Sequence, residues 1–156
     1  MKPMDNKASA ARFLLGGIGT GTISLDQNAR LCDYEIWNLP NKGFRLPYNF
    51  FAVRAESPDG QVNVKALESQ LAPPFNKSHG YHAWQIGGLP RFRHSEMTGD
   101  YPFVRFTLTD ESMPVKAKLE AFTPFIPLAT DDSSLPAAVL RYTICNTGEE
   151  DLMVSV

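Results

Sequence analysis

Apolar and polar residues alternate along the last third of the chain, residues 101–156. The alternating runs lie at residues 103–108, 115–121, 138–144 and 152–156, and in most of them charged or polar side chains occupy the positions between the apolar ones. A period of two gives a strand one buried and one solvated face, which is typical of antiparallel sheets. The alternation therefore predicts four half-buried antiparallel strands in this region.

The first half of the chain shows two hairpin patterns. Residues 20–25 and 31–37 are strand-like and are separated by the turn-rich run DQNAR. Residues 50–55 and 62–67 form the second pair, and the run SPDG between them suits a turn, because proline presets φ and glycine accepts a positive φ. We therefore expect two hairpins before the C-terminal strands.

Residues 7–15 have fair helix propensity, and Gly16 and Gly17 follow them as helix terminators. This predicts a short N-terminal helix, although two turns are marginal without packing partners. We therefore expect residues 1–15 to form an N-terminal segment that is either a short helix or flexible.

Residues 71–99 show no sustained period and contain several glycines, prolines and three histidines. A loop of this length in a compact domain is usually functional or docked on another surface. Together with the strands, it predicts an all-β fold, an antiparallel β-sandwich with long irregular loops, and a closed barrel is the alternative.

The last alternating run reaches Val156 with no turn or polar tail after it. Exposed apolar strand edges favour aggregation, so we expect further strands to cover this edge. The expected organisation is one β-sandwich domain over residues 16–156, which is the N-terminal portion of a larger sandwich and is truncated at its C-terminal end.

Composition excludes several functions. The 156 residues carry a formal charge of −2 with scattered basic side chains, which gives no electrostatic reason to bind nucleic acid. No apolar run is long enough for a transmembrane segment, and the polar N-terminus does not resemble a signal peptide, so we expect a cytoplasmic location. Cys32 and Cys145 are predicted to be free thiols rather than a disulfide.

The run GGIGTG at residues 16–21 resembles a phosphate-binding loop only superficially. The dinucleotide fingerprint requires a strand before the glycines and a helix after them, and the predicted order here is the reverse. No Lys-Ser or Lys-Thr pair follows the run, so it is not a P-loop either. We predict that these glycines permit a tight entry into the first strand.

Catalytic and metal-binding patterns are weak. His79, His82 and His94 have no cysteine or carboxylate at a ligand-like spacing, so we predict no metal site. Asp131 and Asp132 could offer oxygen ligands to calcium, but two adjacent carboxylates fall well short of a complete site. No motif implies a cofactor.

Glycoside hydrolysis requires two facing carboxylates, one of them in an apolar pocket that raises its pKa. Asp33 and Glu35 lie two residues apart on a predicted strand, and Asp131 and Asp132 lie in a predicted loop. Nothing in the sequence supplies the apolar pocket. We therefore predict structural roles for these carboxylates and name no catalytic residue.

Several motifs, taken in order, resemble the N-terminal domain of the non-lysosomal glucosylceramidase (bile-acid β-glucosidase) family, glycoside hydrolase family 116. Each motif is weak alone, but the ordered set is specific and covers nearly the whole chain after the first dozen residues. The motifs are GGIGTG at 16–21, DYEIWNLPNKGF at 33–44, PPF at 73–75, SHG at 78–80, GLPRFR at 88–93, GDYPF at 99–103, EAFTPFIP at 120–127 and DDSSLP at 131–136.

The resemblance implies an N-terminal β-sandwich that packs on a C-terminal (α/α)6 barrel, where the catalytic site lies. Proteins similar to this one hydrolyse β-glucosides, glucosylceramide among them, with retention, through a glutamate nucleophile and an aspartate acid/base. Both residues belong to the helical domain, which has no counterpart in this chain. The resemblance therefore implies a non-catalytic portion of a β-glucosidase whose partners are that barrel and, in the full-length protein, a β-glucoside substrate.

Turn-rich stretches that carry aromatic and charged side chains are the candidates for the rim of the substrate pocket or for the domain interface. These stretches are residues 37–42, 75–93 and 129–134. The candidate residues are Trp37, Asn38, Asn41, Lys42, His79, Trp84, Arg91, Asp131 and Asp132. A stand-alone carbohydrate-binding β-sandwich module is the alternative function, and the coding sequence beyond Val156 would distinguish the two.

Overall fold

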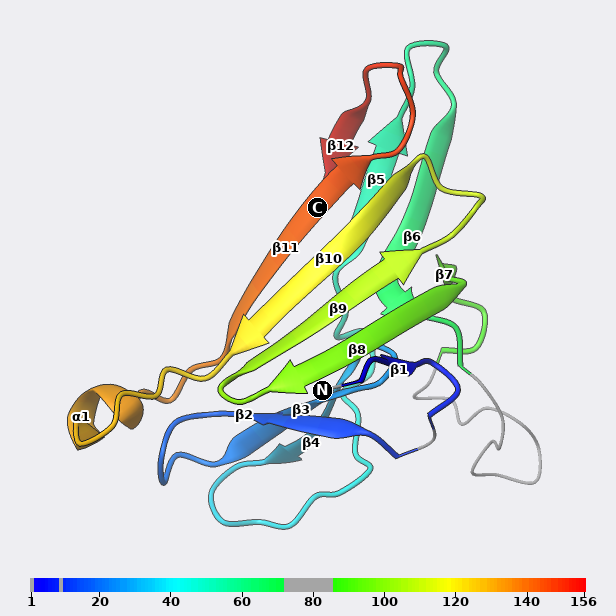
Figure 1. Ribbon diagram of the computed structural model, residues 1–156. Coiled ribbons are helices and arrows are strands. Elements are labelled where there is room, and N and C mark those ends of the chain that lie inside the picture. Colours follow the sequence, from blue (N-terminus) through cyan, green and yellow to red (C-terminus); the bar gives the residue numbers. More distant parts are fainter. Residues whose placement is uncertain (1, 9, 72–85) are drawn as a thin grey trace.

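The computed structural model describes residues 2–8, 10–71 and 86–156 (Figure 1). Within these ranges nearly all regular structure is β-strand, and the strands form three sheets with the orders β1-β8-β9-β10-β11, β12-β5-β6-β7 and β2-β3-β4. The pairings are antiparallel, except that β6 and β7 run parallel. The predicted all-β antiparallel sandwich is confirmed. The elements are β1 (Met4–Asp5), β2 (Arg12–Leu15), β3 (Thr22–Asp26), β4 (Leu31–Glu35), β5 (Ala52–Glu56), β6 (Val62–Ser69), β7 (Arg91–Phe92), β8 (His94–Asp100), β9 (Phe103–Thr109), β10 (Val115–Phe122), α1 (Thr130–Ser133), β11 (Val139–Asn146) and β12 (Met153–Ser155).

The alternating runs of the C-terminal third build the centre of the five-stranded sheet. Leu119 of β10 lies opposite Phe106 of β9 and Tyr142 of β11. Every second side chain of β9 and β10 is buried, as the period of two predicts, whereas the inward row of β11 is only half-buried. The buried row consists of Val104, Phe106, Leu108, Val115, Ala117, Leu119 and Ala121.

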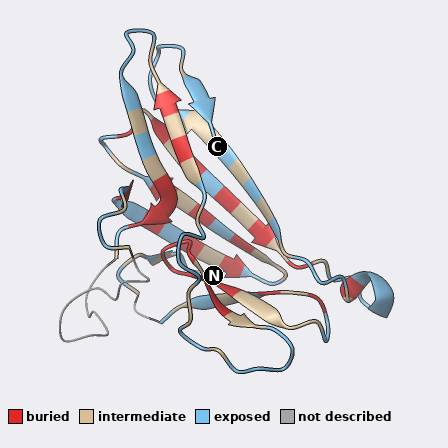
Figure 2. Ribbon diagram, turned by 180° about the vertical axis from the view of Figure 1, so that it is seen from behind, coloured by how far each residue is buried: buried red, intermediate tan, exposed pale blue. Residues whose placement is uncertain are grey.

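The core lies between the sheets, and the strands that face one another carry the residues coloured as buried (Figure 2). Val53, Ala55 and Leu67 from β5 and β6 pack into the same cluster as the buried row of β9 and β10. The last alternating run does not extend the five-stranded sheet. Instead, the chain changes sheets and β12 pairs with β5, where its three residues are exposed.

The turn between β3 and β4 is buried, unlike most surface turns. The side-chain amide of Asn28 donates to Ser69 Oγ at 2.9 Å, and Ser69 Oγ lies 2.8 Å from Ser95 Oγ. Ser95 Oγ donates to the carbonyl oxygen of Gln27 at 2.7 Å, which returns the network to the turn. Because Ser69 ends β6 and Ser95 lies on β8, this polar network joins all three sheets.

The predicted N-terminal helix is wrong. Residues in this segment form β1 and β2, with Met4 opposite Met97 and Leu15 opposite Ile23. A helix of two turns is marginal by itself, whereas a strand at a sheet edge gains backbone hydrogen bonds. Pairing also lets β2 bury Leu15 in the core.

Two local features differ from the sequence-based expectation. Residues 94–100, expected to lie in irregular chain, form the regular strand β8. The turn-rich segment with Asp131 and Asp132 contains the single-turn helix α1. The pairing of β8 with β9 overrides the weak sequence pattern there, and α1, which has no side-chain cap, is held by the hydrogen bonds between Ser133 and the backbone of Ile126.

Two further observations concern the expected thiols and membrane spans. Cys32 and Cys145 are free, as predicted, and burial raises the pKa of Cys32 to about 12. Among the described residues, no helix has both the length and the apolar character that a membrane crossing requires.

A matched pair of valines tests the assignment of the core. Val104→Ala removes methyl groups from a fully buried site, whereas Val64→Ala truncates a side chain that is 51% exposed. We expect Val104→Ala to lower the free energy of unfolding by about 2 kcal/mol and Val64→Ala by less than about 0.5 kcal/mol. Urea unfolding measures both values, and equal losses would contradict the assigned buried face of β9.

Candidate functional site

The glycine run at residues 16–21 forms a loop between β2 and β3 that lies against two other backbone segments. A Cβ atom on Gly17 would lie 2.8 Å from the carbonyl carbon of Ser134 and still closer to the carbonyl oxygen of Leu135. A Cβ atom on Gly21, where φ is +88°, would lie 2.7 Å from the carbonyl oxygen of Glu35. The glycines therefore permit close backbone packing, and a strand follows them rather than the helix that a phosphate-binding loop requires.

The segment at residues 123–138 is hydrogen-bonded to this loop. The backbone N–H of Ile18 donates to the carbonyl oxygen of Ser133 at 2.9 Å, and the N–H of Gly16 donates to Thr123 Oγ1 at 2.9 Å. The buried hydroxyl of Ser133 both accepts from the N–H of Ile126 and donates to its carbonyl oxygen. These bonds hold α1 and its flanking chain at the same end of the molecule as the glycine loop (Figure 1).

The loop after β4 is closed by its own polar side chains. Lys42 Nζ lies 2.5 Å from Glu35 Oε2, and the side-chain amide of Asn41 donates to the carbonyl oxygen of Tyr34 at 3.2 Å. The hydrogen bond from Lys42 lowers the pKa of Glu35. Asp33, which is buried, accepts the backbone N–H of Gly43 at 2.6 Å. The base of this loop is therefore held in one conformation.

The tip of the same loop presents Trp37 and Asn38 to solvent. Both have left-handed backbone conformations, with φ of 55° and 56°, and Trp37 is 87% exposed. Leu128, just before α1, is also left-handed and fully exposed. Left-handed φ is uncommon for residues other than glycine, and such strain is found often at functional sites.

Two open pockets flank the glycine loop. One, of about 380 Å³, is lined by Asn38, Leu39 and Pro40 together with Gly19, Gly21, Thr22 and Glu35. The other, of about 300 Å³, is lined by Ile36 and residues 136–138 together with Leu15, Gly16, Tyr34 and residues 20–23. The glycine loop, the loop after β4 and the chain on both sides of α1 carry exposed apolar side chains, and we call this set the glycine-loop surface: Ile18, Ile36, Trp37, Leu39, Ile126, Leu128 and Leu135.

The structure brings some of the predicted site residues together. Trp37 and Asn38 lie on the glycine-loop surface or line its pocket, and the exposed Asp131 and Asp132 lie on α1 at the same end. Asn41 and Lys42 belong to the base of the loop and hold its shape. His79 and Trp84 lie outside the described residues.

The carboxylates of β4 have structural partners, as predicted. Asp33 lies 3.4 Å from the guanidinium group of Arg12, and Glu35 pairs with Lys42. Among the described residues, no three His, Cys, Asp or Glu side chains are grouped so that they could hold a metal ion.

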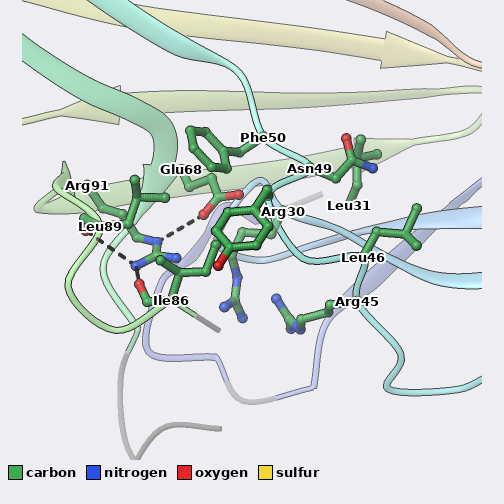
Figure 3. A pocket seen from close by; sticks show the side chains of 11 residues that line it. Arg30, Leu31, Arg45, Leu46, Asn49, Phe50, Glu68, Ile86, Leu89 and Arg91 are labelled. Carbon is green, nitrogen blue, oxygen red and sulfur yellow. Dashed lines mark hydrogen bonds and ion pairs between the residues drawn. The ribbon is translucent and has the colours of Figure 1, made fainter. Parts of the chain in front are cut away.

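Arg91 lies elsewhere, in a small pocket on the side of β7 (Figure 3). Its Nε donates to Glu68 Oε2 at 2.9 Å, and its Nη1 donates to the carbonyl oxygen of Ile86 at 2.9 Å. We call this the arginine pocket; its lining residues are Arg30, Leu31, Arg45, Leu46, Tyr48, Asn49, Phe50, Glu68, Ile86, Leu89 and Arg91. Burial raises the pKa of Glu68, against the opposing effect of Arg91.

At the base of the arginine pocket, two guanidinium groups share one buried carboxylate. Asp26 Oδ2 accepts Arg30 Nη2 at 2.8 Å and Arg45 Nη2 at 2.6 Å. Burial opposes ionisation of Asp26, but the Coulombic attraction of Arg30 and Arg45 prevails and lowers its pKa to about 2. Sequence reasoning missed this cluster because it treated residues 26–30 as an ordinary turn, although an Asp and an Arg four residues apart are a compatible ion pair.

Comparison with known protein families shows which family this chain belongs to. The family described as beta-glucosidase 2, glycosyl-hydrolase family 116 N-term, matches residues 13–156. The chain belongs to this family. The family 116 resemblance seen in the motifs is thereby confirmed, and the chain is an N-terminal domain of a β-glucosidase family. A comparison with individually curated proteins finds no match.

A pair of glycines tests the close packing in this family 116 domain. Neither Gly17 nor Gly88 has a positive φ, but a Cβ on Gly17 would collide with the backbone of residues 134–135, whereas a Cβ on Gly88 meets no atom of the described residues within 4 Å. We expect Gly17→Ala to lower the free energy of unfolding by at least about 2 kcal/mol and Gly88→Ala to change it by less than about 1 kcal/mol. Thermal unfolding provides the measurement, and a neutral Gly17→Ala would rule out the close approach.

The depressed pKa of Asp26 predicts a pH dependence of stability. Since its folded-state pKa lies below its unfolded value of 3.8, the Asp26 contribution is complete above about pH 5 and is lost as the pH falls through about 2. As Asp26 becomes protonated, the free energy of unfolding of the wild-type domain should fall by about 2 kcal/mol. The difference in unfolding free energy between wild type and Asp26→Asn should therefore become smaller over that range. Denaturant unfolding between pH 7 and pH 2 measures the gap, and a constant gap would contradict the assignment.

Proposed function

We propose that this chain is the non-catalytic N-terminal β-sandwich of a retaining β-glucosidase or glucosylceramidase, and that it packs on and supports a C-terminal (α/α)6 catalytic barrel. The glycine-loop surface is the observation that carries this proposal. It combines exposed apolar side chains with a rigidly bonded backbone, which is the character of a preformed docking surface.

Strain and exposure at this surface support docking. Trp37 and Leu128 combine a left-handed backbone with an exposed apolar side chain, each feature unfavourable for a surface that only meets water. Aromatic side chains such as Trp contribute most to protein interfaces when a partner buries them. The barrel is the partner proposed because the family is the N-terminal domain of a glycoside hydrolase.

A non-catalytic role is supported by the environment of the carboxylates. Glu35 has a lowered pKa and holds Lys42, whereas a glycosidase acid requires a raised pKa. Glu68 has a raised pKa, but it is bonded to Arg91 in a pocket of about 20 Å³, too small for a sugar ring. The family resemblance likewise implies that the nucleophile and the acid/base belong to the helical domain.

The exposed loop tips are proposed to reach the rim of the substrate pocket or the domain interface. Trp37 and Asn38 come from the loop after β4, and Asp131 and Asp132 come from α1. All four are exposed at one end of the domain, so a single partner surface could contact them together.

Two exposed apolar residues provide the test in the full-length enzyme. Trp37 is 87% exposed on the glycine-loop surface, whereas Val64 is 51% exposed on β6 and lies outside both that surface and the arginine pocket. We expect Trp37→Ala to lower the Tm of the enzyme by several degrees or kcat/KM for an aryl β-glucoside by at least about 10-fold, corresponding to a hot-spot loss above 1 kcal/mol. Val64→Ala should stay close to wild type.

Two results would contradict this prediction. If Trp37→Ala leaves both Tm and kcat/KM unchanged, Trp37 has neither an interface nor a rim role. Equal losses in the two variants would show that the glycine-loop surface is not the specific contact.

A further inference from the structure

The arginine pocket carries an excess of positive charge. Three guanidinium groups, those of Arg30, Arg45 and Arg91, line it, and two carboxylates, Asp26 and Glu68, pair with them. Glu68 accepts a hydrogen bond from Arg91. Asp26 accepts hydrogen bonds from both Arg30 and Arg45 through the same oxygen, Oδ2. One positive charge therefore lacks its own carboxylate within this cluster.

Arg45, which lines this pocket, has one side-chain nitrogen without a hydrogen-bond partner. Its Nη1 is buried and makes no hydrogen bond, and among buried side-chain atoms of the described residues this condition is shared only with Ser24 Oγ. Figure 3 shows the guanidinium group of Arg45 extending toward that of Arg30, and both groups bind Asp26 Oδ2. A buried cation with an unpaired donor is costly, so such groups are normally paired with an anion.

The missing negative charge cannot come from the residues that the structure does not describe. Met1, Ser9 and residues 72–85 contain no Asp and no Glu. A carboxylate partner for Arg45 must therefore come from outside both this cluster and the undescribed residues, and the pocket that Arg45 lines is the space available for it.

We infer that the arginine pocket binds one carboxylate group, held by Arg45 Nη1 and facing Arg30. Guanidinium groups recognise carboxylates through paired, charge-assisted hydrogen bonds. The pocket has room of about 20 Å³, which suits one or two water-sized atoms and therefore the two oxygens of a carboxylate rather than a bulky phosphoester.

The surroundings strengthen this binding. Leu31, Leu46, Phe50 and Leu89 line the pocket, and an apolar wall lowers the local dielectric and increases the attraction between opposite charges. The carboxylate can come from a small free acid or from an acidic side chain elsewhere in the full-length polypeptide. The chemistry is the same in both cases, and the experiment separates them.

The test uses the full-length protein and sodium formate as the probe, with formate replacing chloride at constant ionic strength. If the pocket is open to free acids, formate should raise Tm by roughly 2–4 °C with saturation. The rise should be lost in Arg45→Met and kept in the control Arg105→Met, which removes a surface arginine paired with Glu120.

A crystal structure of the full-length wild-type protein grown in formate provides a second reading that does not depend on whether Arg45→Met folds. Formate, or an acidic side chain of the polypeptide, within about 3.5 Å of Arg45 Nη1 supports the inference, and a side chain there explains an absent formate response. Only water or no group beside Nη1, or a formate response that persists in Arg45→Met, overturns it.

Discussion

The buried turn between β3 and β4 is the constraint on which the arrangement of the three sheets depends. From this turn, the side-chain amide of Asn28 donates to Ser69 on β6, and the carbonyl oxygen of Gln27 accepts a hydrogen bond from Ser95 on β8. Asp26 closes the same turn by accepting the backbone N–H groups of Asn28 and Arg30. A polar network at the centre of a domain is stable only when its members are satisfied. The relative positions of the sheets are therefore set by directional hydrogen bonds as well as by apolar packing.

At the opposite end of β3, in the three-stranded sheet β2-β3-β4, close backbone contacts fix how neighbouring segments lie. Gly17 allows the chain around Leu135 to approach, and Gly21 allows the approach of Glu35. Two loops that are distant in sequence are thereby fixed next to one another, with their apolar tips exposed. This combination of a rigid base and an exposed tip is what makes the glycine-loop surface suitable for docking, because little conformational entropy remains to be lost on association.

Sequence reasoning succeeded where one local pattern determines the structure. The period of two along β9 and β10 predicted which side chains, such as Val104 and Leu119, are buried. It failed at β2, where pairing with β3 outweighed helix propensity, and at β12, whose partner β5 lies about a hundred residues earlier. Trp37 is exposed, and its role stays a prediction, whereas the cluster around Arg45 depends on long-range contacts that no local pattern reveals.

The pairing of β1 with β8 affects the order of events during synthesis. Met4 leaves the ribosome before its partner Met97, which is made 93 residues later. At the usual 5–20 residues per second, the first strand waits about 5–20 s before it can pair. Contacts between such distant residues slow folding, because a large loop must close before the contact is gained. The nascent chain must therefore remain unaggregated through this interval, and early β-hairpins such as β3–β4 are the elements that can form while it lasts.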